Sequence, residues 1–376
     1  MPLRNLSREE KLDWLRLARC GGIGAIRFHK LVGRLGSAGA VLRALPGMIA
    51  AGTAADVEIC PADRAWRELE AIEELGACLL AACEPGYPLA LREIPDPPPV
   101  LTVLGQVEAL AGPGVGVVGA RNASGNGRLF AKALAAALGA GGLTVVSGLA
   151  RGIDTAAHGG ALEAGAVTVG VIASGVDVPY PPENVGLAAR IAERGAVVSE
   201  RPLGAAPQAR HFPRRNRVIS GLSLGVVVVE AAPGSGSLIT ARLAAEQGRE
   251  VMAVPGTPLD PRHKGTNQLL RDGATLVESA GDVFDTLRPL IGSRRPRPVQ
   301  PAFDLPPPVA AKVPAADADG LAGRLAERLG PEPLAIDELV RQCDATVADV
   351  QGALLDLELA GRLERHPGNR VALRVD

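Results

Sequence analysis

The pattern of apolar positions divides the chain into a helical beginning, a long middle part of alternating elements and a helical end. Residues 1 to about 56 have the periodicity of short helices, and the first is predicted to begin at Ser7, which has capping-box spacing to Glu10. The turn Gly22-Ile-Gly24 separates two helical runs, as in a helix-hairpin-helix or in a tight turn of a small helical bundle. A further amphipathic helix is predicted over Arg64–Leu75.

From residue 115 onward, short runs rich in Val and Ile alternate with helical stretches rich in Ala and Leu. The runs predicted as strands are Val115–Val118, Thr144–Ser147, Val167–Ile172, Val197–Ser199, Val226–Val229 and Val251–Val254. The helical stretches between them include Leu129–Leu138, Asp154–Ala164 and Leu238–Gln247. Because the apolar runs are continuous, both faces of each strand must be covered, which is typical of a parallel, doubly wound α/β sheet.

The last part of the chain follows a proline-rich segment. Residues 292–319 contain seven prolines and almost no periodic apolar pattern, which indicates a stiff linker. The segments Leu321–Leu329, Ile336–Cys343 and Val347–Ala360 are predicted as helices, and residues 361–371 as a hairpin, which together make a winged helix. We therefore predict four parts: a helical SAM/helix-hairpin-helix-like domain (1–56), an extended Rossmann-like domain (57–291), the linker (292–319) and a winged-helix domain (320–376).

The composition is that of a folded protein and gives no global sign of a polyanionic partner. The 376 residues are 47% hydrophobic, and 40 Lys and Arg against 41 Asp and Glu leave a net charge of −1. A nucleic-acid site must therefore be a local patch. Five cysteines without a C-x-x-C pattern predict neither a zinc site nor a disulfide framework. Without a long apolar run, we expect a cytoplasmic protein with no membrane partner. We also expect no cofactor.

One local basic patch lies in residues 109–153, which carry four basic residues and no acid. Arg121 and Arg151 each follow a predicted strand, and Ser147 and Gly148 lie just before Arg151. In an open α/β sheet, ligands bind outside the carboxyl ends of the strands, where helix N-termini donate N–H groups to anions. We expect both arginines at one rim of the sheet. The alternative is that they are solvated loop residues of an Arg-rich chain.

A denser basic patch follows, with five arginines and no acid between Arg201 and Arg217. Guanidinium groups pair with phosphates, and an exposed ring offers a stacking face to a nucleobase. The predicted contacts are phosphate contacts by Arg214, Arg215 and Arg217, a polar contact by Asn216 and a base contact by Phe212. The alternative is that Phe212 covers the core while the arginines pair with carboxylates.

A segment rich in Gly and Ser follows the predicted strand that ends at Val229 and begins a helix. The backbone N–H groups of this segment and the hydroxyls of Ser235 and Ser237, on either side of Gly236, can approach a phosphate. The segment is not a Walker loop, because it contains no Gly-Lys-Ser/Thr. Nucleotide hydrolysis is therefore not predicted.

Signatures of enzymes are weak in the chain. A G-x-G-x-x-G string at residues 114–119 runs through a predicted strand, and no acid lies between Glu108 and Asp154 to bind a ribose hydroxyl, so a dinucleotide site is not predicted. Neither a zinc-deaminase pattern nor a nucleophile elbow occurs. Asp154 opens a helical stretch and is predicted to cap it.

The predicted third helix of the C-terminal domain, Val347–Ala360, carries three acids and no Lys or Arg. Its charge disfavours direct reading of a DNA major groove. The hairpin that would form the wing is basic, with Arg362, Arg365, Arg370 and Arg374. We expect this domain to contact DNA by its wing or to bind protein.

The motifs together resemble those of the DNA-processing protein A (DprA/Smf) family over nearly the whole chain. The matching segments are Tyr87 to Leu91 with Asp96-Pro-Pro, Val118-Gly-Ala-Arg121, Ser147 to His158, Gly175 to Asn184, Phe212-Pro-Arg-Arg-Asn-Arg217, Gly236-Ser-Leu-Ile-Thr240, Pro255-Gly256 and Gly265-Thr-Asn267. By position, Arg121 matches the DNA-contacting Arg of that family. The Lys often present in the Tyr-Pro-x-x-Asn loop of the family is replaced here by Pro182 and Glu183.

The resemblance implies an extended Rossmann domain that binds single-stranded DNA without catalysis. It also implies a role in natural transformation, in which the protein protects incoming DNA, relieves occlusion by single-strand-binding protein and loads the recombinase RecA. Dimerisation through the Rossmann domain is implied as well. If five arginines neutralise five phosphates, the logarithm of the affinity should fall with the logarithm of salt concentration at a slope of about −3.5.

The alternative is an enzyme, a nucleoside-monophosphate phosphoribohydrolase of the lysine-decarboxylase-like type on a Rossmann scaffold. Such enzymes carry P-G-G-x-G-T-x-x-E, in which the Glu serves the chemistry. Here Pro233-Gly-Ser-Gly-Ser is followed by no carboxylate before Glu246. The acid that this reaction needs is absent from its place in the motif.

Overall fold

The structure is a computed structural model that describes residues 3–293, 318–330, 332–343, 345–367 and 369–373. The predicted linker, apart from residues 292–293 and 318–319, and Arg374 of the predicted wing lie outside the described residues. The N-terminal segment folds into helices α1 (Arg8–Ala18), α2 (Ala25–Leu35), α3 (Ala38–Ala50) and α4 (Ala62–Glu74). The predicted capping box is confirmed, because the Ser7 hydroxyl accepts the Glu10 N–H and the Glu10 carboxylate accepts the Ser7 N–H.

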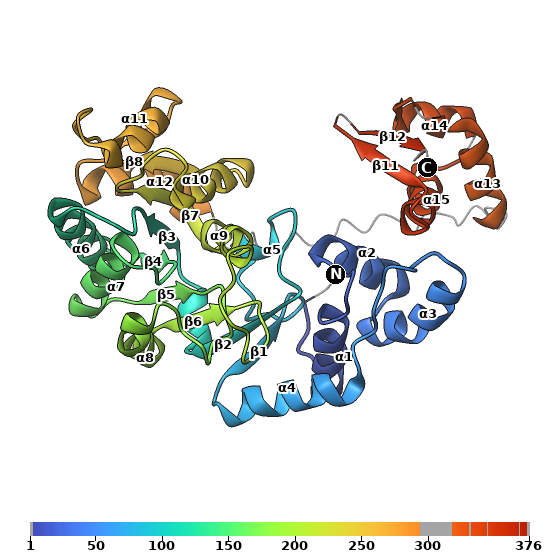
Figure 1. The fold of residues 1–376 in the computed structure, drawn as a ribbon, viewed down its shortest axis with the longest axis horizontal. Coiled ribbons are helices and arrows are strands. Elements are labelled where there is room, and N and C mark those ends of the chain that lie inside the picture. Colours follow the sequence, from blue (N-terminus) through green and yellow to red (C-terminus); the bar gives the residue numbers. More distant parts are fainter. Residues whose placement is uncertain (1–2, 294–317, 331, 344, 368, 374–376) are drawn as a thin grey trace, which may run out of the picture. The chain divides into compact units, whose positions relative to one another are not determined.

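In the described part of the chain, nine strands form one sheet in the order β1-β2-β6-β5-β4-β3-β7-β8-β9 (Figure 1). The strands are β1 (Cys78–Ala81), β2 (Val100–Gly105), β3 (Gly114–Val118), β4 (Thr144–Ser147), β5 (Thr168–Val171), β6 (Ala196–Ser199), β7 (Ser223–Val228), β8 (Glu250–Ala253) and β9 (Thr275–Leu276). From β6 to β9 in this order every pairing is parallel, whereas β1 pairs with β2 and β2 with β6 in antiparallel fashion. The doubly wound parallel sheet is confirmed, and the antiparallel edge is an addition to the prediction.

Helices cover both faces of this sheet because the residues of its strands are buried on both sides. The helices of this part are α5 (Leu89–Arg92), which packs on α9, and then α6 (Gly125–Ala140), α7 (Ile153–Glu163), α8 (Val185–Arg194), α9 (His211–Gly221), α10 (Gly236–Glu246), α11 (Lys264–Arg271) and α12 (Ala280–Ser293). Val117 and Val227 share one apolar cluster with Leu134 of α6 and Leu287 of α12. Val226 is next to Val227 and therefore points to the opposite face of the sheet. It is fully buried as well, because α9 and α10 pack against this strand.

The order of the strands reverses at β3. From β3 the chain proceeds through β4 and β5 to β6 on one side, and then returns through α9 to β7, β8 and β9 on the other side of β3. The carboxyl ends of the neighbouring strands β3 and β7 therefore form a topological switch point, where α/β sheets of this kind bind ligands.

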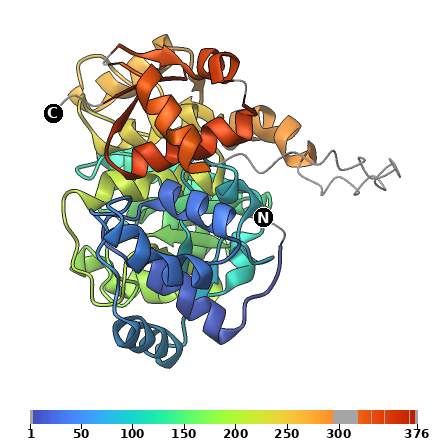
Figure 2. The same cartoon turned by 90° about the vertical axis from the view of Figure 1, so that its right-hand side faces the viewer.

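The C-terminal part forms a small module of its own, with α13 (Ala318–Arg328), α14 (Ile336–Cys343), α15 (Val347–Leu359) and the strands β10 (Leu334–Ala335), β11 (Leu363–His366) and β12 (Arg370–Leu373). The strands pair in the order β10-β12-β11, and the hairpin β11–β12 lies beside the helices (Figure 2). Leu325, Leu339, Leu354 and Val371 form its buried core. The predicted winged helix is confirmed.

Candidate nucleic-acid interface

Two adjoining pockets open beyond the carboxyl ends of the parallel strands. The large pocket, about 590 Å³, is lined by the loops that follow β3 and β7 and by residues of α9 and α10. The small pocket, about 310 Å³, is lined mainly by the loops that follow β3, β4 and β5. The residues that line both are Arg121, Asn122, Ala150 and Phe212. The two pockets therefore share a wall at the topological switch point.

The residues predicted as contacts divide into three groups. Those that line one or both pockets are Arg121, Gly148, Arg151, Phe212, Arg215, Asn216, Ser235, Gly236 and Ser237. Arg214 is exposed on α9 but is not part of either lining. The side chains of Ser147 and Arg217 instead point into the protein and bind other residues there. The structure thus brings together residues from four separate segments of the sequence.

Phe212 is the centre of the shared wall. The guanidinium carbon of Arg121 lies 4.9 Å from the centroid of the Phe212 ring, and the Tyr180 ring meets Phe212 edge-on at 6.0 Å between centroids. The guanidinium carbon of Arg215 lies 5.9 Å from the same ring. Phe212 is partly buried, so it is neither a core residue nor the openly exposed ring that the sequence predicted.

The loop after β4 is held in place by Asp154. Its carboxylate accepts the N–H groups of Gly148 and Ala150, at 3.1 and 3.3 Å. Asp154 is the second residue of α7, whose N-cap is Gly152, so the prediction that Asp154 caps the helix was wrong. The carboxylate instead folds back onto the preceding loop and accepts two of its N–H groups.

Gly152 sets the position of that loop against the loop after β3. It has a φ of 77°, and a Cβ on it would lie 2.3 Å from the carbonyl oxygen of Ala120. Only glycine tolerates both the positive φ and the close contact with this carbonyl oxygen without strain. This close approach brings Arg121 and Arg151, which follow two different strands, to the lining of the same small pocket.

Arg215 differs from its prediction as a phosphate contact. It is buried, and its guanidinium donates to the carbonyl oxygens of Gly148, at 2.6 Å, and of Val171. Burial lowers the pKa of Arg215 to about 10, so the group remains charged at neutral pH. Burial raises the pKa of Asp154 to about 6, although the positive charge of Arg215 and the backbone N–H groups oppose that rise. Arg215 is thus a structural cation beneath the pockets.

Arg217 and Ser147 also differ from their predictions. The Arg217 side chain is only 12% exposed and forms ion pairs with Glu200, at 2.6 Å, and with Asp96, at 3.1 Å. This is the alternative in which arginines of the patch pair with carboxylates. Ser147 is fully buried in β4, and its hydroxyl donates to the carbonyl oxygen of Val117. Neither side chain is available to a strand at the surface.

The N-terminus of α10 lies in the large pocket. Ser235 is the N-cap, and its hydroxyl accepts the Ser237 N–H. The side-chain amide of Asn216 donates to the carbonyl oxygen of Gly236 at 3.1 Å, which fixes α9 to the beginning of α10. Exposed Gly236 allows a ligand to approach the positive end of the helix dipole.

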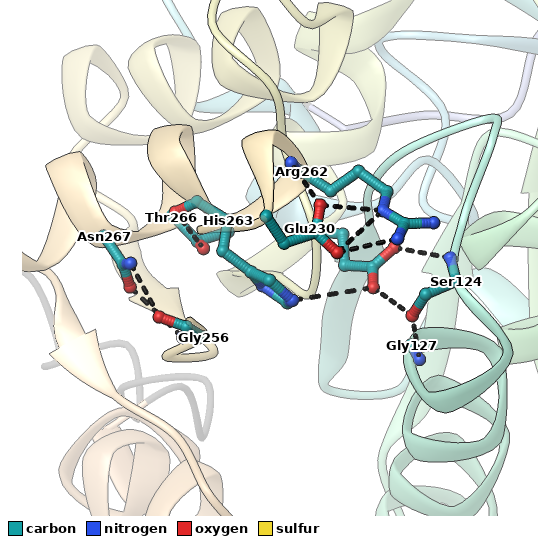
Figure 3. A network of polar contacts seen from close by, with 9 residues as sticks. Ser124, Gly127, Glu230, Gly256, Arg262, His263, Thr266 and Asn267 are labelled. Atoms are coloured by element: carbon teal, nitrogen blue, oxygen red, sulfur yellow. Dashed lines mark hydrogen bonds and ion pairs between the residues drawn. The ribbon is translucent and has the colours of Figure 1, made fainter. Parts of the chain in front are cut away.

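Glu230 is a site residue that the sequence-based reasoning missed. It is fully buried just beyond β7, and its carboxylate accepts the N–H and the hydroxyl of Ser124, the N-cap of α6. His263 Nε2 lies 3.9 Å from the same carboxylate (Figure 3). Glu230 therefore ties the loop that carries Arg121 to the end of β7. A lone acid directly after a continuous apolar strand was the available signal.

Two further residues were missed at the pockets. Arg262 lines the large pocket and forms an ion pair with Asp260 at 2.7 Å. Tyr180 lines the small pocket and is 39% exposed. The available signal was an aromatic residue, one of nine in the chain, in a proline-rich segment after a predicted strand.

Arg151 forms an ion pair with Glu183, which stands at one of the two positions where the resemblance leads one to expect a lysine. Both side chains are more than half exposed. The pKa of Glu183 is lowered by a backbone hydrogen bond and by its hydrogen bond to Arg151. The charge of Arg151, one of the two arginines that line the small pocket, is thus partly neutralised by Glu183.

Within the described residues, no group of three or more His, Cys, Asp and Glu side chains is arranged to hold a metal ion. In the same part of the chain, no helix has the length and apolar character needed to cross a bilayer.

Models of known protein families match three segments of the chain. DNA recombination-mediator protein A matches residues 78–288, the DprA winged helix domain residues 309–369, and the DprA-like N-terminal HHH domain residues 8–71. The chain is 34% identical to Protein Smf of Synechocystis, over 81% of this chain and 82% of that protein. It is 38% identical to Protein Smf of Escherichia coli, over 81% and 79% of the two chains.

Two solved structures resemble the α/β part. DNA processing protein A from Streptococcus pneumoniae has a TM-score of 0.56 and 40% identity, covering 59% of this chain and 80% of the other. DNA processing protein A from Helicobacter pylori, whose structure concerns its single-stranded DNA binding mode, has a TM-score of 0.52 and 29% identity, covering 57% and 96%.

Proposed function

Because the chain belongs to the DprA/Smf family of DNA-processing proteins, we propose that its two pockets bind single-stranded DNA and that it acts as a recombination mediator. The strand is held without chemical change and is delivered to the recombinase RecA, with displacement of single-strand-binding protein. The protein acts in the cytoplasm during natural transformation, as a homodimer assembled through the Rossmann domain. It uses no cofactor.

The wall shared by the two pockets is the observation that supports this proposal most. It combines the cation of Arg121 with the ring of Phe212, and Arg151 and Tyr180 continue it in the small pocket. Phosphate groups need cations, and unpaired bases need flat apolar surfaces, so a surface that offers both suits a single strand. The related protein from Helicobacter pylori, which binds single-stranded DNA, supports the same ligand class.

The structure revises the expected strength of the electrostatic contribution. Arg215 and Arg217 are engaged within the protein, so three exposed arginines remain from the original five: Arg121, Arg151 and Arg214. At about 0.7 per phosphate for single strands, the expected salt slope becomes about −2 instead of about −3.5.

The phosphoribohydrolase alternative requires a carboxylate positioned for chemistry near the Gly- and Ser-rich loop. Asp154 is the acid in the lining of the large pocket, and its carboxylate is occupied by two backbone N–H groups. Thr240 stands close to where the motif places its Glu, and its hydroxyl donates to the carbonyl oxygen of Gly236. Binding of an intact strand therefore fits this site better than cleavage of a nucleotide.

The test is binding of a labelled 30-nucleotide oligomer, single-stranded or double-stranded, followed by fluorescence anisotropy over a salt series. We expect a strong preference for the single strand and a slope near −2. Equal affinity for both forms, or an affinity independent of salt, would contradict the proposal. Release of a free base from a nucleoside monophosphate would favour the enzyme instead.

A further inference from the structure

We propose that helices α1 and α4 position α9, and thereby set the affinity of the pockets for a strand, through a buried chain of ion pairs and hydrogen bonds from Arg19 to Arg217. The inference rests on the proposed function, because binding of single-stranded DNA is its main readout. It gives a positioning role to residues that lie outside both pocket linings.

The chain of contacts begins at the end of α1. Arg19 is the C-cap of this helix, and its guanidinium donates to both carboxylate oxygens of Glu68 on α4, at 2.7 to 3.0 Å. Only 10% of the Arg19 side chain and 9% of the Glu68 side chain are exposed. Arg19 Nη1 donates to the backbone carbonyl oxygen of Glu200 at 3.2 Å. One buried guanidinium thus ties two helices to the residue that follows β6.

Glu200 continues the chain to α9. Its carboxylate accepts Arg217 Nη2 at 2.6 Å, and the Asp96 carboxylate lies 3.1 Å from Arg217 Nε. Arg217 Nη1 is buried and has no hydrogen-bond partner among the residues that the structure describes. Because a buried charge that loses its partner is costly, the guanidinium depends on the two carboxylates that it has. The position of Arg217 therefore follows that of Glu200.

Other residues of α9 line the pockets. Phe212 belongs to the wall that the two pockets share, and Asn216 fixes the beginning of α10 through the carbonyl oxygen of Gly236. A helix moves as a rigid element, so a shift at Arg217 displaces both side chains. Binding residues must be held within about 0.5 Å of their productive geometry, so a small displacement lowers the affinity.

The first experiment compares Arg19→Met with the wild type, using anisotropy with a labelled thymidine 30-mer at a temperature at which circular dichroism shows each variant to be folded. We expect Arg19→Met to weaken binding about fivefold. The salt slope should stay unchanged, because Arg19 is not a phosphate contact. Arg8→Met is the matched control, since it removes the same charge from another ion pair between α1 and α4, with Glu73 at 2.9 Å, and should leave the affinity within about 1.5-fold.

Equal affinity of wild type and Arg19→Met would overturn the inference, and so would a salt slope less steep by about 0.7, which indicates a direct phosphate contact. Absence of wild-type binding would overturn the proposed function instead. If Arg19→Met does not fold, Arg19→Lys takes its place. An ammonium group keeps the charge but lacks the planar fork that holds Glu68 and reaches Glu200, so we expect about threefold weaker binding.

A double variant tests whether the contacts act as one chain. Glu200→Gln weakens the link to Arg217 but keeps the backbone carbonyl group that Arg19 uses. If the chain is already interrupted there, Arg19→Met should cause little further loss of affinity in the Glu200→Gln background. Fold-changes that multiply, as expected for independent sites, would contradict the proposed chain.

Hydrogen exchange followed by mass spectrometry tests the link without DNA. Amides of α9 should exchange faster in Arg19→Met than in the wild type, because the helix loses part of its support, whereas Arg8→Met should leave them unchanged. Equal exchange of α9 in all three proteins would overturn the inference. This result does not depend on whether the pockets bind DNA, so it separates failure of the inference from failure of the proposed function.

Discussion

Replacement of Arg215 by methionine tests whether this arginine supports the site from within or binds the strand directly. The guanidinium is buried and donates to the carbonyl oxygens of Gly148 and Val171. Its charge also lowers the pKa of the neighbouring Asp154 carboxyl, which is buried with it. Methionine has a similar length but no charge, so Arg215→Met leaves two carbonyl groups unsatisfied and the Asp154 carboxylate without its cation.

Removal of a buried, hydrogen-bonded cation costs about 3–5 kcal/mol, because its two carbonyl partners and the nearby Asp154 charge are left uncompensated. We therefore expect Arg215→Met to lower the free energy of unfolding by that amount, measured by urea denaturation followed by circular dichroism. Arg214→Met is the control, since Arg214 is the exposed neighbour on the same helix and its loss should change stability by less than about 0.5 kcal/mol. The double variant with Asp154→Asn should recover part of the loss.

The pH dependence gives a second readout. The pKa of Asp154 rises from 3.8 to about 6 on folding, so the native state binds the proton more tightly and stability falls as the pH increases through this interval. The difference corresponds to about 3 kcal/mol, and Asp154→Asn should remove that part of the fall. Arg215→Met should extend the fall to higher pH, because loss of the cation raises the pKa of Asp154 further. Unchanged stability in Arg215→Met, together with a loss of DNA affinity alone, would refute the structural role.

The remaining predictions concern the pockets themselves. Arg121→Ala should weaken binding of single-stranded DNA of every sequence alike and reduce the steepness of the salt slope by about 0.7, and an unchanged slope would count against a phosphate contact. Glu183→Gln should raise the affinity for single-stranded DNA in the same assay, because it releases Arg151 from its ion pair. The control is Glu163→Gln, which removes the same charge from an exposed ion pair with Lys132. An equal gain in affinity in both variants would show that only the net charge matters. Gly152→Ala should lower the free energy of unfolding by about 1–3 kcal/mol, since its φ of 77° strains any other residue, and wild-type stability in urea would contradict this.

The strands of the parallel sheet were predictable because each is a continuous apolar run. β3 to β8 all lie within three residues of the predicted ranges. β1, β2 and β9 were not predicted. β9 has only two residues, and β1 and β2 form an antiparallel edge whose apolar residues lie next to a proline-broken segment. These three segments form strands because they pair with neighbouring strands, and the local sequence pattern does not reveal such pairing.

The meeting of Arg121 and Arg151 at one rim was predictable, because parallel strands place their carboxyl ends at the same edge. The burial of Arg215 does not follow from the basic patch predicted between Arg201 and Arg217, because that prediction includes no helix, whereas His211–Gly221 form α9. On a helix, Arg215 lies on the same face as the apolar Val218 and Ile219, three and four positions later, and that spacing indicates an inward side chain. The ion-pair partners of Arg217, Asp96 and Glu200, lie in other segments of the sequence, so the residues around Arg217 do not predict them.

The wall common to the two pockets has a consequence for how contacts along one strand combine. If the two pockets bind a strand as proposed, a nucleotide in one pocket confines its neighbour beside the other, so the second contact is intramolecular and benefits from a high effective concentration. Weak individual contacts would then add up to tight retention of a long strand, whereas mononucleotides would dissociate readily. Release would proceed one nucleotide at a time, so an acceptor would take over the strand in small steps.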